Sequence, residues 1–159
     1  MKRYLVLLLL LAGPVLAQVD DTRAYLEILR SDFNADKVAL YNRVLQLTEP
    51  EAKKFWPIYR DYERELMKLS DQRLELIRDF FAHDEAGKLT NDASKEIANR
   101  WLQSVQARLD LWKKYHKKIS EAVSPTRAAQ FLQLENQLAL FIDLAIASEM
   151  PAIKPAVSK

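Results

Sequence analysis

The chain has 159 residues, of which 49% are hydrophobic and 29% are charged, and it contains no cysteine. Its formal charge is +2, because 24 Lys and Arg residues nearly balance 22 Asp and Glu residues. These values are typical of one ordinary globular domain. The lack of cysteine excludes disulfides, thiolate metal sites and thiol nucleophiles. The balanced charge argues against nucleic-acid binding, which depends on an excess of Lys and Arg to neutralise phosphates.

The N-terminus has the pattern of an export signal. Lys2 and Arg3 precede an apolar run from Tyr4 to Ala12, and the small residue Ala17 follows a few positions later. This arrangement predicts a cleaved signal peptide of bacterial style over residues 1–17. The run is too short to span a bilayer, which takes about 20 apolar residues. We therefore expect a periplasmic protein that does not span the membrane.

Two stretches of the chain show the spacing of long amphipathic helices. In both, apolar residues recur at alternating steps of three and four, with one polar interruption in each series. The first series is Phe55, Tyr59, Tyr62, Leu66, Leu69, Arg73, Leu76 and Phe80. The second series is Ala98, Leu102, Val105, Leu109, Trp112, His116, Ile119 and Val123. The pattern predicts two long helices, each with one face packed against a neighbour.

Capping signals place the ends of these helices. Thr48 is followed by Glu51 in the capping-box arrangement, which satisfies free N–H groups at a helix start. Pro57 lies inside the same helix and predicts a kink rather than a stop. The polar stretch around Gly87 predicts the turn between the two helices, and Ser124 before a proline predicts the start of another helix.

The remaining segments complete an all-α architecture. An earlier helical pattern runs from Leu26 to Leu47, and the last helix is apolar on nearly every face from Leu138 to Ala147. We predict an elongated helical hairpin of long amphipathic helices, with four to five helices in all, that could pair as a homodimer. Residues 18–150 form its single domain, and residues 151–159 are expected to be a disordered tail.

Two helix starts repeat the same pattern of cap, small residue and aromatic residue. This repeat has two possible explanations: any two capped amphipathic helices could share the pattern, or the pattern is the signature of a protein family. The strings Leu47-Thr48-Glu49-Pro50-Glu51 and Val123-Ser124-Pro125-Thr126-Arg127 resemble the two L-T-x-x-Q motifs of the Spy/CpxP-type periplasmic proteins. The Gln position of the motif is occupied by Glu51 in the first string and by Arg127 in the second. The motif positions are Leu47, Thr48, Glu51, Ala52 and Phe55 in the first string, and Val123, Ser124, Arg127, Ala128 and Phe131 in the second.

The resemblance implies an ATP-independent chaperone or envelope-stress adaptor. In such proteins a dimer of curved helical hairpins offers an amphipathic surface to unfolded or membrane-derived clients. Gly87 is the single glycine after the expected signal peptide, so residues 18–159 carry no glycine-rich phosphate loop, and no cofactor is expected. Two alternatives remain: a sensor or regulatory subunit that docks on one envelope signalling protein, and a metal-responsive periplasmic protein.

The changed motif positions suggest an ion pair. Glu51 and Arg127 occupy equivalent positions of the two helix starts and carry opposite charges. We therefore expect a salt bridge between them, in place of the two glutamines, if the helix starts lie side by side.

Several charged residues are candidates for client contact. A basic run flanks two aromatic residues, a combination that binds acidic and partly apolar chains, although such a run is more often a solvated helix face. Arg73 either lies at the edge of the core or belongs to a partner surface. The candidate client-binding residues are Arg73, Lys113, Lys114, Lys117 and Lys118. The histidines, His83 and His116, lack the surroundings of metal ligands, and we predict neither a metal site nor catalytic residues.

Overall fold

The computed structural model describes residues 37–85, 89–150 and 152. The expected signal peptide and most of the expected tail lie outside these residues, as does the first part of the early helical pattern. The chain divides into two compact units, Met1–Arg43 and Val44–Lys159, and each is described by itself.

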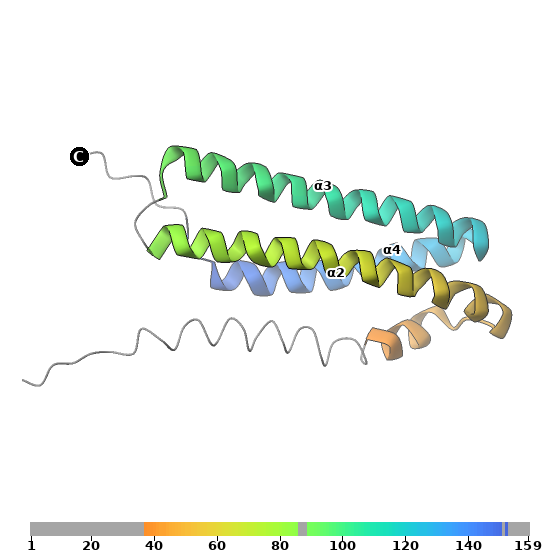
Figure 1. Cartoon of the computed structure of the whole chain (residues 1–159). Coiled ribbons are helices and arrows are strands. Elements are labelled where there is room, and N and C mark those ends of the chain that lie inside the picture. The colour runs from red at the N-terminus through yellow and green to blue at the C-terminus, as the bar shows by residue number, and fades with distance from the viewer. Residues whose placement is uncertain (1–36, 86–88, 151, 153–159) are drawn as a thin grey trace, which may run out of the picture. The chain divides into compact units, whose positions relative to one another are not determined.

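The described residues form helices and no strand. Residues 37–45 are helical, and three long helices follow: α2 (Glu49–Glu85), α3 (Asn91–Ala122) and α4 (Pro125–Glu149). Figure 1 shows that α3 runs antiparallel to both α2 and α4, so that α2 and α4 run in the same direction. The prediction of an all-α helical hairpin is confirmed. No helix in the described ranges has both the length and the hydropathy needed to cross a membrane.

The ends of the helices follow the capping signals. The Thr90 side chain accepts a hydrogen bond of 3.2 Å from the amide of Ala93 at the start of α3. The Ser124 side chain does the same for the amide of Arg127 at the start of α4, also at 3.2 Å. The helix α2 continues through Pro57 for 37 residues, which is about 55 Å at 1.5 Å per residue. The proline therefore does not end the helix.

The apolar series of α2 lies on its buried face, as predicted. Phe55, Tyr59 and Tyr62 are almost completely buried, and Leu76 and Phe80 are at most 5% exposed. The rings of Phe55, Tyr59 and Tyr62 form a continuous aromatic cluster with rings of the neighbouring helices. Tyr62 is the centre of it, with its ring centroid 5.3 Å from that of Tyr115 on α3 and 5.0 Å from that of Phe131 on α4. Burial of these large side chains is the main source of stability in the bundle.

The series predicted for α3 is only partly buried. The buried residues of this helix are Leu111, Tyr115 and Ile119. Of the predicted series, Ile119 belongs to this set, whereas Leu102 is 57% exposed and Leu109 is 42% exposed. The prediction of a packed series along the whole helix is therefore wrong for its N-terminal half.

The packing differs between the two ends of the bundle. No residue between 91 and 110 of α3 is buried, and none of the side chains described between 136 and 148 of α4 is buried. By contrast, Ala128 and Phe131 of α4 are fully buried, and Leu134 is 4% exposed. On α3 and α4 the buried side chains thus lie in the half that contains the start of α4, whereas near the turn between α2 and α3 the buried side chains, such as Leu76 and Phe80, belong to α2.

Candidate functional site

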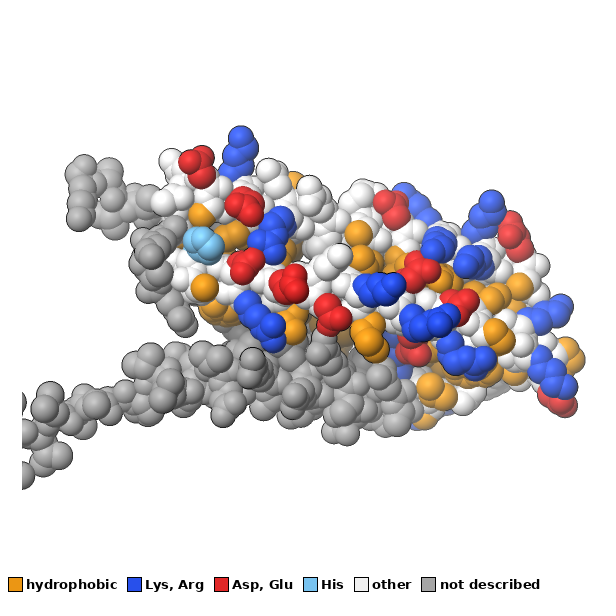
Figure 2. All heavy atoms as spheres, viewed as in Figure 1, with side chains coloured by type: hydrophobic (Ala, Val, Ile, Leu, Met, Phe, Trp, Pro, Cys, Tyr) orange, Lys and Arg blue, Asp and Glu red, His pale blue; other side chains and the backbone are white. Residues whose placement is uncertain are grey.

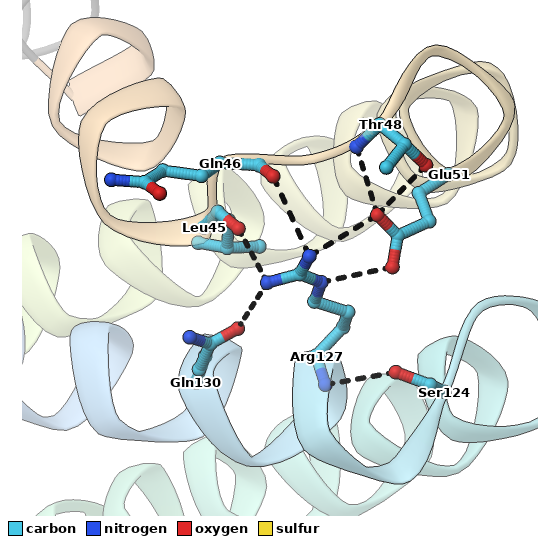
Figure 3. A network of polar contacts seen from close by, with 7 residues as sticks. All are labelled: Leu45, Gln46, Thr48, Glu51, Ser124, Arg127 and Gln130. Carbon is cyan, nitrogen blue, oxygen red and sulfur yellow. Dashed lines mark hydrogen bonds and ion pairs between the residues drawn. The ribbon is translucent and has the colours of Figure 1, made fainter.

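The two motif strings meet in the structure. Thr48 and Glu51 at the start of α2 face Ser124 and Arg127 at the start of α4, although the two charged residues are 76 positions apart in the sequence (Figure 3). Because α2 and α4 run in the same direction, equivalent positions of the repeat lie beside each other. We call this group of residues the motif junction.

The predicted ion pair between Glu51 and Arg127 is present. Nε of Arg127 lies 3.0 Å from Oε1 of Glu51, and an Nη atom lies 3.2 Å from Oε2. The pair is bidentate, the geometry in which a guanidinium and a carboxylate interact most strongly. The two side chains are 20% and 26% exposed, so the pair is largely shielded from solvent.

Arg127 also holds the backbone that leads into α2. Its guanidinium donates to the carbonyl oxygen of Leu45 at 2.5 Å, to that of Gln46 at 3.4 Å and to the side chain of Gln130 at 3.1 Å. Gln46 has a positive φ of 45°, which turns the chain so that both carbonyls point at Arg127 (Figure 3). With the two bonds to Glu51, these contacts use the five N–H donors of a guanidinium.

The carboxylate of Glu51 is held in its charged form. The hydrogen bonds from Arg127, and then those from the backbone amide and hydroxyl of Thr48, lower the pKa of Glu51 from 4.5 to about 2. The two Thr48 bonds are 2.8 Å and 2.9 Å long. Glu51 therefore caps α2 and binds α4 at the same time, and it stays ionised at any ordinary pH.

The apolar motif positions lie beneath the ion pair. Phe55, Ala128 and Phe131 are completely buried. The other two, Ala52 and Val123, are half-buried, as is Leu47. The repeat is thus the sequence pattern of a structural junction, in which caps, an ion pair and small and aromatic side chains fix two helix starts together.

A buried carboxylate was not anticipated from the sequence. Glu135 of α4 is 3% exposed and accepts a short hydrogen bond from the hydroxyl of Tyr62. The indole N–H of Trp112 donates to the same hydroxyl at 3.1 Å. Burial, and then the charge of Glu135, raises the pKa of Tyr62, so the phenol remains protonated and can act as the donor. This network joins α2, α3 and α4 within the aromatic cluster.

The four candidate lysines of α3 have partners within the molecule. Lys114 contacts Glu65 of α2 at 2.7 Å, and Lys118 lies over the Tyr115 ring. Lys113 and Lys117 pair with acidic residues on their own helix. On the face seen in Figure 2, Lys and Arg side chains are interspersed with Asp and Glu side chains rather than gathered into a patch of one sign. The lysines are exposed and could still exchange these partners for others.

Arg73, the fifth candidate, lies in an ion cluster between helices. Its guanidinium contacts Asp143 of α4 at 2.5 Å, and Arg108 of α3 binds the same carboxylate at 3.0 Å and 3.2 Å. Burial alone would raise the pKa of Asp143, but the bonds from Arg108 and Arg73 outweigh it and lower the pKa. Asp143 could have been singled out as the one charged residue of an apolar segment, but nothing in the sequence identified its partners.

Exposed apolar side chains gather on α3 and α4. Leu102, Val105 and Leu109 share one face of α3 by their spacing, and they are 57%, 38% and 42% exposed. On α4 the corresponding residues are 60–70% exposed. The contact of Arg108 with Asp143 places residues 108 and 143 at the same level of the bundle, so the two groups, which flank these residues in the sequence, lie at a similar level. We call them together the apolar strip: Leu102, Val105, Leu109, Leu140, Phe141 and Leu144.

The histidines do not form part of a metal centre in the described residues. His83 lies in the last turn of α2, where its Nδ1 is 2.7 Å from the carbonyl oxygen of Asp79. Within the ranges that the structure covers, no group of three or more His, Asp or Glu residues is arranged to hold a metal ion. Comparisons of the chain with protein-family models, with curated proteins and with solved structures found no match.

Proposed function

We propose that this protein is a Spy/CpxP-type periplasmic chaperone or envelope-stress adaptor, which captures non-native protein clients on an amphipathic helical surface without ATP. The observation that carries the proposal is the apolar strip. Six large apolar side chains at one level of α3 and α4 are 38–70% exposed, where a helix packed on all sides would bury them.

The occupant of this surface is an exposed apolar segment of an unfolded polypeptide. The strip is rich in aliphatic side chains, which make non-directional contacts and therefore accept many sequences. The charge of the whole chain is nearly balanced, at +2, so the protein as a whole does not attract a strongly charged partner. Weak contacts of this kind exchange without an energy source, which is what a chaperone without ATP requires.

The motif junction supports the resemblance in a second way. The two glutamine positions of the family motif are occupied here by Glu51 and Arg127, which make a bidentate ion pair. The junction is thereby closed by a charged pair in place of two amides. The same arrangement of helix starts can therefore form with different residues at these two motif positions. The apolar strip then lies on helices that the motif junction fixes at one end.

The test is suppression of aggregation. The purified protein, at a near-stoichiometric ratio and without ATP, is mixed with a chemically unfolded test protein, with a chelator and with zinc in parallel arms. We expect protection in all arms. Protection of no test protein would favour a dedicated signalling partner, and protection only with zinc would favour the metal-responsive alternative.

Variants of the strip make the test specific. Replacing Leu102 and Leu109 by serine should weaken protection strongly, because both side chains of α3 are exposed and contribute binding surface rather than core. The matched control is Met67→Ser on α2, which removes an apolar side chain that is 57% exposed and lies outside the strip. Equal effects of the strip variant and the control would contradict the proposal.

The lysines provide an independent arm. Neutralising Lys113, Lys114, Lys117 and Lys118 together should weaken protection of acidic clients more than that of basic ones, because mixed basic and aromatic surfaces attract acidic chains. Unchanged protection would remove these lysines from the binding surface and leave the apolar strip as its sole candidate.

A further inference from the structure

The C-terminal half of α4 is less firmly packed than its N-terminal half. The stretch 136–148 is apolar at most positions, yet no side chain in it is buried. In the N-terminal half of the same helix, Ala128 and Phe131 are fully buried. A helical stretch with few buried contacts opens at a lower free-energy cost than the core to which it is attached.

One charged residue ties this stretch to the other helices. Asp143 is the single charged side chain between 136 and 148, and it contacts Arg73 of α2 and Arg108 of α3. The three side chains are 24–31% exposed. The ion cluster is therefore partly open to solvent, unlike the aromatic cluster, in which Tyr62 is fully buried.

The cluster contains two guanidinium groups and one carboxylate. Arg108 binds Asp143 with two hydrogen bonds, and Arg73 adds a third. One carboxylate neutralises one of the two arginines. The planar guanidinium is the group best suited to bind carboxylates in pairs of hydrogen bonds. The surface beneath the stretch 136–148 therefore favours a helix that carries negative charge.

We propose that the stretch 136–148 of α4 covers, within the molecule, a second client-binding surface on α2 and α3, beside the α3 residues of the apolar strip, and that Arg73 and Arg108 select apolar helical segments carrying a carboxylate. This inference rests on the proposed function and names its preferred client class. Such a client takes the place of the stretch, and its carboxylate takes the place of Asp143.

An occupied surface weakens the binding of any competitor. The apparent affinity for a client is reduced by the fraction of molecules in which the surface is free. A change that loosens the stretch without harming the core should therefore strengthen client binding. Asp143→Asn is such a change, because it removes the charge that contacts both arginines and keeps the size of the side chain.

The test uses two synthetic peptides as probes. One has the sequence of residues 136–148, and the other has Asn in place of its aspartate. Their binding to the purified protein and to its Asp143→Asn variant is measured by fluorescence anisotropy. We expect the variant to bind the acidic peptide about tenfold or more tightly than the unaltered protein does, and to bind the Asn peptide about tenfold less tightly than the acidic one.

Two further variants control the interpretation. Asp110→Asn removes an exposed carboxylate that pairs with Lys113 on α3, and it should leave peptide affinity unchanged. The double variant Arg73→Gln and Arg108→Gln should bind both peptides equally. Hydrogen exchange should show faster exchange between 136 and 148 in Asp143→Asn, with the amides of the first turns of α2 unchanged, which verifies that the core stays folded.

The outcomes separate this inference from the proposed function. Equal affinity for the two peptides, or an affinity that Asp143→Asn does not change, would overturn the inference even if the protein suppresses aggregation. If the peptides bind with the expected preference but aggregation is not suppressed, the surface and its selectivity stand, and the chaperone function fails.

Discussion

The buried network around Tyr62 offers the sharpest test of how the helices are held together. The hydroxyl of Tyr62 donates to the carboxylate of Glu135, which is 3% exposed, and accepts from Trp112. Tyr62→Phe removes both bonds and keeps the ring. The buried carboxylate and the indole N–H are then left without this partner, and water cannot reach them easily.

The magnitude follows from the burial. A hydrogen bond to a charged group contributes about 1.5–3 kcal/mol, and the burial of Glu135, which is 3% exposed, makes the upper part of that range appropriate. We expect Tyr62→Phe to lower the free energy of unfolding by about 2–3 kcal/mol. For a chain of this size that corresponds to a decrease in Tm of roughly 5–10 °C. Urea and thermal denaturation followed by circular dichroism measure both quantities.

The chain provides a matched control. Tyr115 is equally buried, and its hydroxyl also donates to a carboxylate, that of Glu65 at 2.9 Å. The Glu65 side chain is 39% exposed, so water can replace the lost bond. Tyr115→Phe should cost less than about 1 kcal/mol. If the two substitutions cost the same, burial of the carboxylate does not determine the strength of the network, and the reasoning is refuted.

Three further predictions concern the motif junction and the packing. Because the pKa of Glu51 is lowered from 4.5 to about 2, its contribution to stability is present above pH 4.5 and is lost as the pH falls toward 2. The difference in unfolding free energy between the protein and its Arg127→Gln variant, measured by denaturant titration, should therefore shrink over that range. A constant difference would contradict this prediction. Reversing both charges, E51R with R127E, should restore only part of the stability lost in either single variant, because a glutamate at position 127 cannot donate to the carbonyl of Leu45. Full restoration in a double-mutant cycle would show that the backbone contacts of Arg127 contribute nothing. Phe131→Ala should cost about 3–5 kcal/mol in urea denaturation, whereas Leu144→Ala, at 70% exposure, should stay within about 0.5 kcal/mol, and similar costs would mean that α4 is packed evenly.

The sequence predicted local structure well because local structure depends on nearby residues. Ser124 caps its helix as expected, and Thr90 caps α3 in the same way, since a cap needs only its own side chain and an amide three residues away. The ion pair of Glu51 with Arg127 was predictable for another reason. The repeat implied that the two helix starts are equivalent, and equivalent helix starts that lie side by side bring equivalent positions together.

The contacts that sequence analysis missed depend on backbone geometry and on a third helix. The bonds from Arg127 to the carbonyls of Leu45 and Gln46 require the left-handed backbone at Gln46, which no local pattern indicated. The exposure of Leu102 and Leu109 could not be predicted from spacing either. Spacing identifies the apolar face of a helix, but whether a partner covers that face is decided by the length and position of the neighbouring helices.

The two arginine clusters show how one bundle can be firm at one end and exchangeable at the other. Arg127 directs its five donors at five acceptors, and four of these lie at the start of α2 or in the segment before it, where no client could replace them without unfolding that start. Arg73 and Arg108 instead share one carboxylate that belongs to a weakly buried stretch. A tethered stretch competes at an effective concentration in the millimolar range. A free client can displace it only if it binds more tightly than the stretch does, and a second carboxylate facing the unneutralised arginine is one way to gain that affinity. The excess of arginine over aspartate at this cluster would then favour acidic apolar clients over the protein's own helix.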